Sequence, residues 1–215
     1  MPRFHPTDEH LLDYVTGAQE ESLALLIASH LSLCPECRAR AAALEALGGS
    51  LLQEAEAQPL RPTALNDCLE RISAAGEAVV PPSPPPVHDP LVPAPLRTYL
   101  GRPLAELPWR GIGPVREFRV PVPTPGHTVK LLRIAPGASL PEHRHGGEEL
   151  TLVLAGGFSD GVASFARGDV ACADSSVVHT PVADDDGECI CLAVTTGPVR
   201  FTGFVGRLLN LVVRY

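Results

Sequence analysis

A histidine and two cysteines near the N-terminus have the spacing of a metal site. His30 and Cys34 are four residues apart, and Cys37 is three residues further on, so on a helix all three side chains would project from one face. One imidazole and two thiolates supply three corners of the tetrahedral coordination that zinc prefers. The alternative is a core histidine beside a redox CxxC motif, but that motif normally follows a strand, and none is expected here. The spacing therefore predicts zinc.

The fourth ligand of this site must come from another segment. His5 and His10 are the local candidates. We prefer His5, because it precedes the first expected helix and can swing toward the other three residues. His10 remains the alternative.

A second group of metal-binding side chains stands in the C-terminal half. His143 and His145 alternate along the chain, so on a strand they point to the same face. Glu149 follows a glycine pair at the start of the next expected strand and can return to the same point, although its neighbour Glu148 could replace it. His179 is the only histidine further downstream and is the expected third imidazole.

Three imidazoles and one carboxylate suit zinc, iron, manganese or nickel, and the ligand types alone do not choose among them. Four protein ligands on zinc leave no open position, which favours a structural or sensing site. A five- or six-coordinate iron or manganese ion would leave room for oxygen or a substrate. The remaining alternative is that these are surface residues of an empty barrel.

Helices must position the first group. Apolar periodicity, capping residues and Pro35 in a first turn predict helices over residues 7–17, 19–33, 35–57 and 63–76. Four short helices bury little apolar area, and such small domains usually need a cross-link such as a bound metal ion for stability. Bound zinc supplies one, since structural zinc contributes on the order of 10 kcal/mol to folding.

Strands must position the second group. Beyond residue 95 the apolar pattern changes to a period of two with frequent Gly and Pro. Strands are expected over residues 115–122, 127–134, 150–154, 162–165 and 190–195. Many short strands at regular spacing indicate a jelly-roll barrel. The predicted fold class is therefore an all-α N-terminal domain of about four helices followed by an all-β C-terminal barrel.

A proline-rich stretch separates the two patterns. Residues 81–95 contain eight of the 23 prolines in the chain, and such a segment prefers extended polyproline II and acts as a semi-rigid spacer. We therefore expect a helical domain over residues 1–80, a linker over 81–95 and a barrel domain over 96–215.

Charge divides at the same place. Residues 1–80 carry five Arg against twelve Asp and Glu, a net charge of −7, whereas residues 81–215 carry twelve basic against thirteen acidic residues, a net charge of −1. An acidic helical module repels nucleic acid and favours a basic protein partner. The alternative is that the acidic surface only keeps the domain in solution.

The sequence also bears on localisation. No basic segment followed by an apolar run opens the chain, so we expect no signal peptide. No apolar stretch reaches the roughly 18 residues that a membrane span requires, so we expect a cytoplasmic protein.

In that reducing compartment the six cysteines indicate metal binding or redox sensing more than a disulfide framework. Cys189 and Cys191 alternate on an expected strand, either as core residues or, if exposed near the metal, as oxidant-sensitive thiols.

The first motif resembles a known domain. His-x3-Cys-x2-Cys on a small N-terminal helical domain is similar to the zinc-binding anti-sigma domain, which occludes a sigma factor of the extracytoplasmic-function type. The resemblance covers about the first 80 residues. It implies a one-to-one heterodimer with such a sigma factor and four zinc ligands, which are His5, His30, Cys34 and Cys37.

The second motif resembles another family. The pattern Gly137-x5-His143-x-His145-x3-Glu149-x6-Gly156 is similar to the first motif of the cupin superfamily. Three landmarks of the second cupin motif are matched by Gly161, Gly168 and His179. Ala166 departs from the pattern, which has proline there. The resemblance implies a cupin metal site made by His143, His145, Glu149 and His179.

Together the two motifs resemble the ChrR-type anti-sigma factors across nearly the whole chain. That resemblance implies a regulatory protein, not an enzyme, that holds a sigma factor inactive until singlet oxygen or a related oxidant acts, with the cupin domain needed for the response. It also implies two bound metal ions, with zinc expected in both. One alternative is a cupin dioxygenase or isomerase fused to a helical zinc domain, although no separate acid–base pair is evident. The other is a metal store or sensor without a sigma partner.

Overall fold

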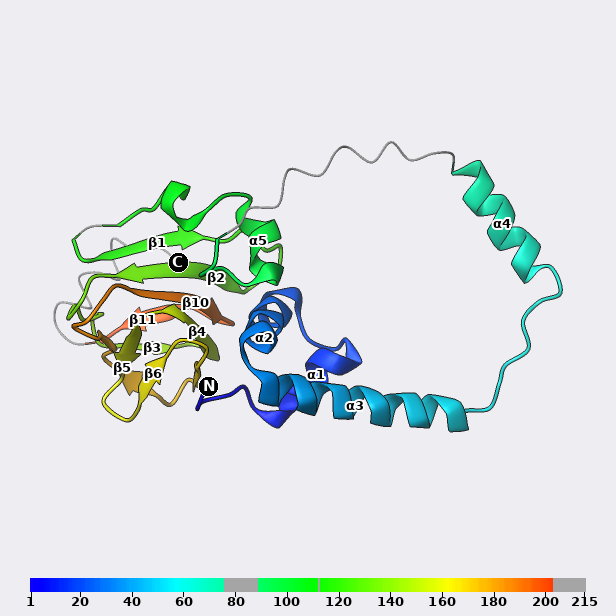
Figure 1. Cartoon of the computed structure of the whole chain (residues 1–215), viewed down its shortest axis with the longest axis horizontal. Helices are drawn as coiled ribbons and strands as arrows, with labels where there is room; N and C mark the ends of the chain where they lie inside the picture. Colours follow the sequence, from blue (N-terminus) through cyan, green and yellow to red (C-terminus); the bar gives the residue numbers. More distant parts are fainter. Residues whose placement is uncertain (76–88, 112, 203–215) are drawn as a thin grey trace.

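The computed structural model describes residues 1–75, 89–111 and 113–202 (Figure 1). Its helices are α1 (Asp8–Thr16), α2 (Glu21–Leu33), α3 (Pro35–Glu54), α4 (Ala64–Ala74) and α5 (Ala94–Leu100), with a 3-10 turn η1 (Leu104–Glu106). The first four confirm the expected helices, with ends shifted by at most three residues. No helix in these described ranges is long and apolar enough to cross a membrane.

Local chemistry explains where the first helices begin and end. The Thr7 side chain accepts a hydrogen bond from the backbone N–H of His10, and Gly17 ends α1 with a φ of 73°. Cys34 is extended between α2 and α3, and its Sγ accepts the backbone N–H of Cys37 at 3.4 Å. Pro35 follows in the first turn of α3, where its missing N–H costs nothing. The junction therefore brings both cysteines to one place.

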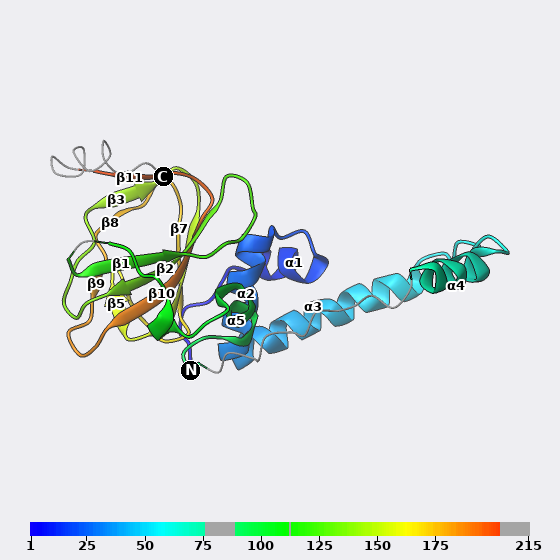
Figure 2. The same ribbon diagram turned by 90° about the horizontal axis from the view of Figure 1, so that it is seen from above.

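The C-terminal part is built from antiparallel strands. They are β1 (Val115–Arg119), β2 (Thr128–Ile134), β3 (His143–His145), β4 (Glu149–Ala155), β5 (Gly157–Ser159), β6 (Ser164–Ala166), β7 (Val170–Ala173), β8 (Val178–His179), β9 (Val182–Ala183), β10 (Cys189–Thr195) and β11 (Val199–Phe201). A five-stranded sheet has the order β1-β2-β10-β4-β7, and two three-stranded sheets have the orders β11-β3-β8 and β6-β5-β9. Figure 2 shows these sheets curving around a common interior. The expected all-β barrel is confirmed.

The first helices pack directly on this barrel. Helix α2 contacts α5, β4 and β10, and the fully buried side chains of Leu26 and Ile27 belong to the same hydrophobic cluster as Leu152 and Leu192 of the barrel. The two parts therefore share one core, which the expectation of two domains held apart by a spacer did not include. The exact domain boundaries stay a prediction.

Part of the expected linker is folded. Its residues 81–88 lie outside the described ranges. From Asp89 onward the chain packs against the helices, because Val92 and Leu96 are buried in the shared core and α5 begins at Ala94. Proline is tolerated in the first turn of a helix, so Pro95 does not prevent α5. Treating each proline as part of a spacer missed this helix.

The far half of α3 and all of α4 are exposed. Helix α4 has no buried residue and stands clear of the barrel in Figure 1. The expectation that four helices form one small domain holds for α1, α2 and the start of α3. We call residues 45–74, which cover the far half of α3 and α4, the helical arm.

Candidate metal centres

The first centre lies where α2 meets α3. His5 comes from the segment before α1, His30 from α2, Cys34 from the junction and Cys37 from the first turn of α3. One ligand atom from each of the four lies within 4.8 Å of all the others. The Nδ1 atom of His5 is 3.5 Å from Cys34 Sγ and 3.3 Å from Cys37 Sγ. The structure therefore brings together the four residues expected from the sequence.

His30 has the orientation of a metal ligand. Its side chain is fully buried, and its Nδ1 is 2.8 Å from the carbonyl oxygen of Gly168. A carbonyl can only accept, so Nδ1 carries the proton and Nε2 carries the lone pair. That buried Nε2 has no hydrogen-bond partner. Burial lowers the pKa of His30 to about 4, which keeps the imidazole in the neutral form that binds metals.

The cysteines also fit a cation. Burial, together with the neighbouring Cys34, raises the pKa of Cys37 to about 12. Two buried sulfurs this close to each other cannot both carry negative charge without a compensating cation. A zinc ion would stabilise both thiolates and would fill the space faced by the unpartnered Nε2 of His30. The four side chains therefore fit zinc, and ligation by them remains a prediction.

His10, the alternative fourth ligand of the first centre, contacts other residues. Its Nδ1 is 2.8 Å from the Thr7 hydroxyl, and its Nε2 is 3.1 Å from a carboxylate oxygen of Glu148. His10 therefore links α1 to the barrel and does not join the four-residue group. The same contact holds Glu148 away from the second centre, for which it was the alternative carboxylate.

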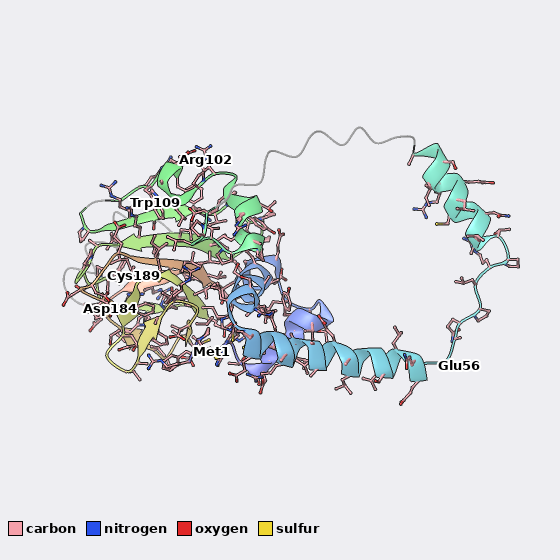
Figure 3. All side chains as sticks on the ribbon, viewed as in Figure 1. Met1, Glu56, Arg102, Trp109, Asp184 and Cys189 are labelled. Atoms are coloured by element: carbon pink, nitrogen blue, oxygen red, sulfur yellow. The ribbon has the colours of Figure 1, made fainter. Side chains whose placement is uncertain are left out.

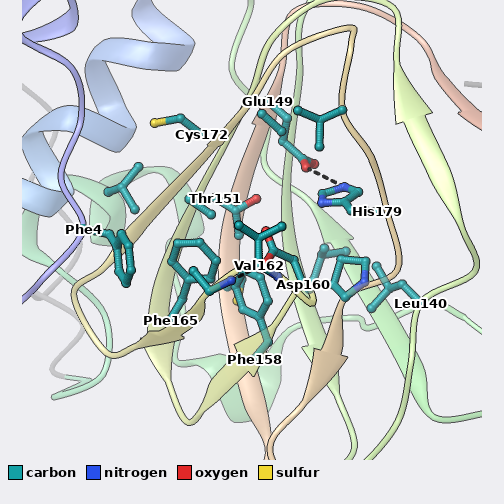
Figure 4. A pocket seen from close by; sticks show the side chains of 18 of the residues that line it. Phe4, Leu140, Glu149, Thr151, Phe158, Asp160, Val162, Phe165, Cys172 and His179 are labelled. Carbon is teal, nitrogen blue, oxygen red and sulfur yellow. Dashed lines mark hydrogen bonds and ion pairs between the residues drawn. The ribbon is translucent and has the colours of Figure 1, made fainter.

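The second centre lies inside the barrel. The β3–β8 register places His143 directly opposite His179, and their Nε2 atoms are 3.1 Å apart. The Nε2 atom of His145 is 3.2 Å from that of His179 and 3.0 Å from Glu149 Oε2. Figure 4 shows Glu149 and His179 turned toward each other, and Glu149 Oε2 is 3.8 Å from His179 Nε2. All four expected residues meet here, with ligand atoms within 4.8 Å of one another.

The chemistry of this second group also fits a cation. The Nδ1 atom of His143 is 2.8 Å from the Pro141 carbonyl oxygen, so its Nε2 carries the lone pair. Burial lowers the pKa of His143 and of His179, and for His179 the neighbouring His143 adds to the effect. Neutral imidazoles that present lone pairs to one point, beside a carboxylate, are suited to a divalent ion. Within the described ranges, the first and second centres are the two groups of His, Cys, Asp or Glu side chains whose ligand atoms converge closely enough to hold a metal ion.

The paired cysteines of β10 are core residues. Cys189 and Cys191 are both buried, and their sulfurs are 3.4 Å apart. The hydrogen bond with Cys189, followed by burial, raises the pKa of Cys191 well above its usual value. A thiol with a raised pKa stays protonated and is weakly nucleophilic, so the state of Cys191 and the burial of both residues agree with the packing alternative.

Three residues that hold the first centre in place were not predicted in that role. Gly168 accepts the hydrogen bond that orients His30, Asp169 accepts backbone hydrogen bonds from the segment before His5, and Phe4 packs in the barrel. Gly168 was visible only as a cupin landmark, and Asp169 and Phe4 have no informative spacing. Their partners lie more than 130 residues away, so no local pattern could reveal them.

Comparison with known proteins places the chain among regulators. Residues 103–200 match the family model described as the ChrR cupin-like domain. The anti-sigma-E factor ChrR of Cereibacter sphaeroides is 42% identical over 210 residues, which are 97% of this chain and 96% of that protein. A crystal structure of Rhodobacter sphaeroides SigE in complex with the anti-sigma ChrR matches with a TM-score of 0.78 and 40% identity, covering 91% of this chain and 99% of that one.

Proposed function

Because the chain belongs to the ChrR family of anti-sigma factors, we propose that it binds and inhibits a sigma factor of the extracytoplasmic-function type. The complex is a one-to-one heterodimer in the cytoplasm. It releases the sigma factor when singlet oxygen or a related oxidant acts on the barrel. The protein contacts no nucleic acid itself and prevents the sigma factor from reaching RNA polymerase.

The observation that carries this proposal is the helical arm. Seven large apolar side chains of the arm are exposed, which are Leu47, Leu51, Leu52, Leu60, Leu65, Leu69 and Ile72. Leu65, Leu69 and Ile72 recur at helical spacing along α4, so they share one face. Figure 3 shows the arm standing clear of the barrel, with its side chains projecting on several sides. Exposed apolar faces of this extent mark protein-binding surfaces.

The charge of the arm supports a basic partner. Residues 45–74 carry five acidic and two basic side chains, so negative charge borders the apolar face. A sigma factor presents basic surfaces to DNA, and such surfaces are attracted to an acidic arm. The apolar face then supplies affinity, and the charge supplies the rate of association.

Zinc bound at the first centre would supply a structural cross-link between the start of the chain, α2 and α3. His5, His30, Cys34 and Cys37 would hold it, and they fix the point from which α3 extends into the arm. The second centre would hold zinc or a redox-active ion such as iron, manganese or nickel. Oxidant damage to one of its ligands then changes the packing of the helices on the barrel, and inhibition is lost.

The competing function is a cupin oxygenase or isomerase, and it is favoured only by the space beside the second centre. The carboxylate nearest to that space outside the metal group belongs to Asp160. Its Oδ1 accepts the backbone N–H groups of Val162 and Ala163 at 2.9 Å, so it caps a turn. A smaller space on another side of His143 and Glu149 is lined by Glu117 and Lys130, which form an ion pair at 2.8 Å, so among the described residues this pair is the acid–base candidate that an enzyme would use.

The test is reconstitution with a candidate sigma factor from the native host. The metal-loaded full chain should co-elute with it in equal amounts and should inhibit its transcription with RNA polymerase. Singlet oxygen generated by a photosensitiser should restore transcription. A full chain that turns over an organic substrate but forms no such complex would support the enzyme instead.

A further inference from the structure

A cavity opens beside the second metal centre inside the barrel. Its volume is about 430 Å³, which is within the range of small-molecule sites. Figure 4 shows Phe4, Phe158, Phe165 and Leu140 around it. Most of the wall is apolar, and His143, Glu149 and His179 make its polar end. Thr151 and Asp160 add polar groups to the wall, and His5 and Thr7 add two more from the N-terminal segment. A ligand that fits would have an apolar body and one polar group at the metal end.

One wall of this cavity comes from the opposite end of the chain. Phe4 packs against Phe165, with ring centroids 4.7 Å apart. The Phe4 carbonyl accepts the backbone N–H of Val170 at 3.0 Å, and the Phe4 N–H donates to the carboxylate of Asp169 at 3.1 Å. Asp169 is only 1% exposed. The N-terminal segment is therefore fastened along β7 of the barrel.

The residue after Phe4 belongs to the other metal centre. His5 faces the sulfurs of Cys34 and Cys37, while His30 donates to Gly168. Three consecutive barrel residues, 168–170, thus position both imidazoles of the first centre, one directly and the other through Phe4. A side chain that lines the cavity is one peptide bond away from a zinc ligand.

We propose that this cavity binds a small, mainly apolar molecule bearing one oxygen-containing group, and that Phe4 relays its occupancy to His5. The apolar body lies against Phe4, Phe158 and Phe165, and the hydroxyl, carbonyl or carboxylate faces the histidines. Displacement of the Phe4 ring moves the backbone that carries His5. The relay rests on the proposed zinc centre, whereas the binding does not.

The binding step is tested on the metal-loaded full chain by calorimetric titration. The probes are 1-alkanols and alkanoates of four to ten carbons, which carry a neutral or an anionic oxygen group. We expect one saturable site and about fourfold tighter binding for each added methylene until the cavity is full. If neither series shows saturable binding, the cavity is not such a site.

Two variants locate that binding. Ala171 lines the cavity from β7, so Ala171→Phe fills it and should weaken binding by at least about tenfold. Ala57→Phe, at an exposed position between α3 and α4, is the matched control and should bind as the wild type does. Phe4→Ala changes only the N-terminal wall and should shift the preferred chain length upward, which provides a second check if Ala171→Phe does not fold. Unchanged binding in both cavity variants would place the probe elsewhere and overturn the proposal.

The relay is tested with cobalt in place of the native metal. Thiolate-to-cobalt charge transfer reports only on the first centre, because the second has no thiol among its four residues. Saturating 1-octanol should change this absorption in the wild type and leave it unchanged in Phe4→Ala. If the probe binds and the absorption does not respond in the wild type, the relay is wrong. If the charge-transfer band never forms, the zinc centre of the proposed function fails instead.

Discussion

At the scale of single residues, a backbone carbonyl orients each of two candidate ligands, that of Gly168 for His30 and that of Pro141 for His143. His143 and His145 share a strand face, so their convergence follows from the geometry of one element. His30 and Cys37 lie on different helices, α2 and α3, and meet because Cys34 is extended at the junction between them. The choice of His5 over His10 rested on flexibility, and the structure brings His5 to the cysteines. The carbonyl of Gly168 could not be foreseen, since it lies 138 residues from His30.

Removing one thiol of the first centre should remove its metal. Cys37→Ser replaces a predicted thiolate ligand by a weak one, so bound metal should fall from about two ions to about one per chain. Elemental analysis of the purified protein measures this, and the melting temperature should fall as well. Cys68→Ser, at an exposed cysteine of α4, is the matched control and should keep both metals. Two metals in Cys37→Ser would show that the thiolate is not a ligand.

Two neighbouring glutamates, Glu148 and Glu149, allow the role of the second centre in the response to be tested with a matched control. Glu149→Gln removes the charge of a predicted ligand, so sigma binding should persist while release under singlet oxygen falls by about tenfold or more. Glu148→Gln changes the adjacent residue, which contacts His10, and release should stay normal. Release is measured as transcription restored in a reconstituted assay. Equal release from both variants would remove the second centre from the response.

At the scale of elements, strongly periodic segments were predictable and short ones were not. Helices α1 and α4 and strand β2 have clear periods, whereas β10 is a continuous apolar run that is buried throughout. Strands β5, β8 and β9 contain only two or three residues and are held by their partners, so their own sequence has too little pattern to reveal them. Helix α5 was hidden by its prolines. His179 reaches the metal centre on β8 despite Ala166, because its pairing with His143 fixes the register.

The exposed face of α4 should contribute to affinity and not to folding. Replacing Leu69 and Ile72 by Glu puts charge into a face that would be buried by the sigma factor, so Kd should rise at least about tenfold. The melting temperature of the free protein should not change, because α4 has no buried residue. Val162→Glu, at an exposed apolar residue of the barrel, is the control. Calorimetry on the purified pair measures Kd, and wild-type affinity in the double variant would exclude this face.

At the scale of the whole molecule, the main departure from expectation is the shared core. Composition indicated two domains, because apolar periodicity and charge both change near the prolines. Composition cannot show that α2 packs on β4 and β10, since burial against a distant element leaves the same helical pattern as burial within a bundle. This packing gives a physical route by which an event in the barrel reaches the helices.

One leucine of α2 should therefore stabilise both parts together. Leu26 is fully buried between helices and barrel, whereas Leu47 of α3 is 59% exposed. Leu26→Ala should lower the free energy of unfolding by about 2–5 kcal/mol, and Leu47→Ala by less than about 0.5 kcal/mol. Urea denaturation followed by circular dichroism for the helices and by Trp109 fluorescence for the barrel part measures both. If only the helical signal shifted in Leu26→Ala, the two parts would not share a core.

The measurement that tests the central claim most directly is the stoichiometry of the metal-loaded full chain with a candidate extracytoplasmic-function sigma factor from its native host, by light scattering after size-exclusion chromatography. The account predicts a one-to-one complex that blocks transcription by the sigma factor and separates after exposure to singlet oxygen. A fully metal-loaded chain that elutes alone beside every such sigma factor of that host would contradict it.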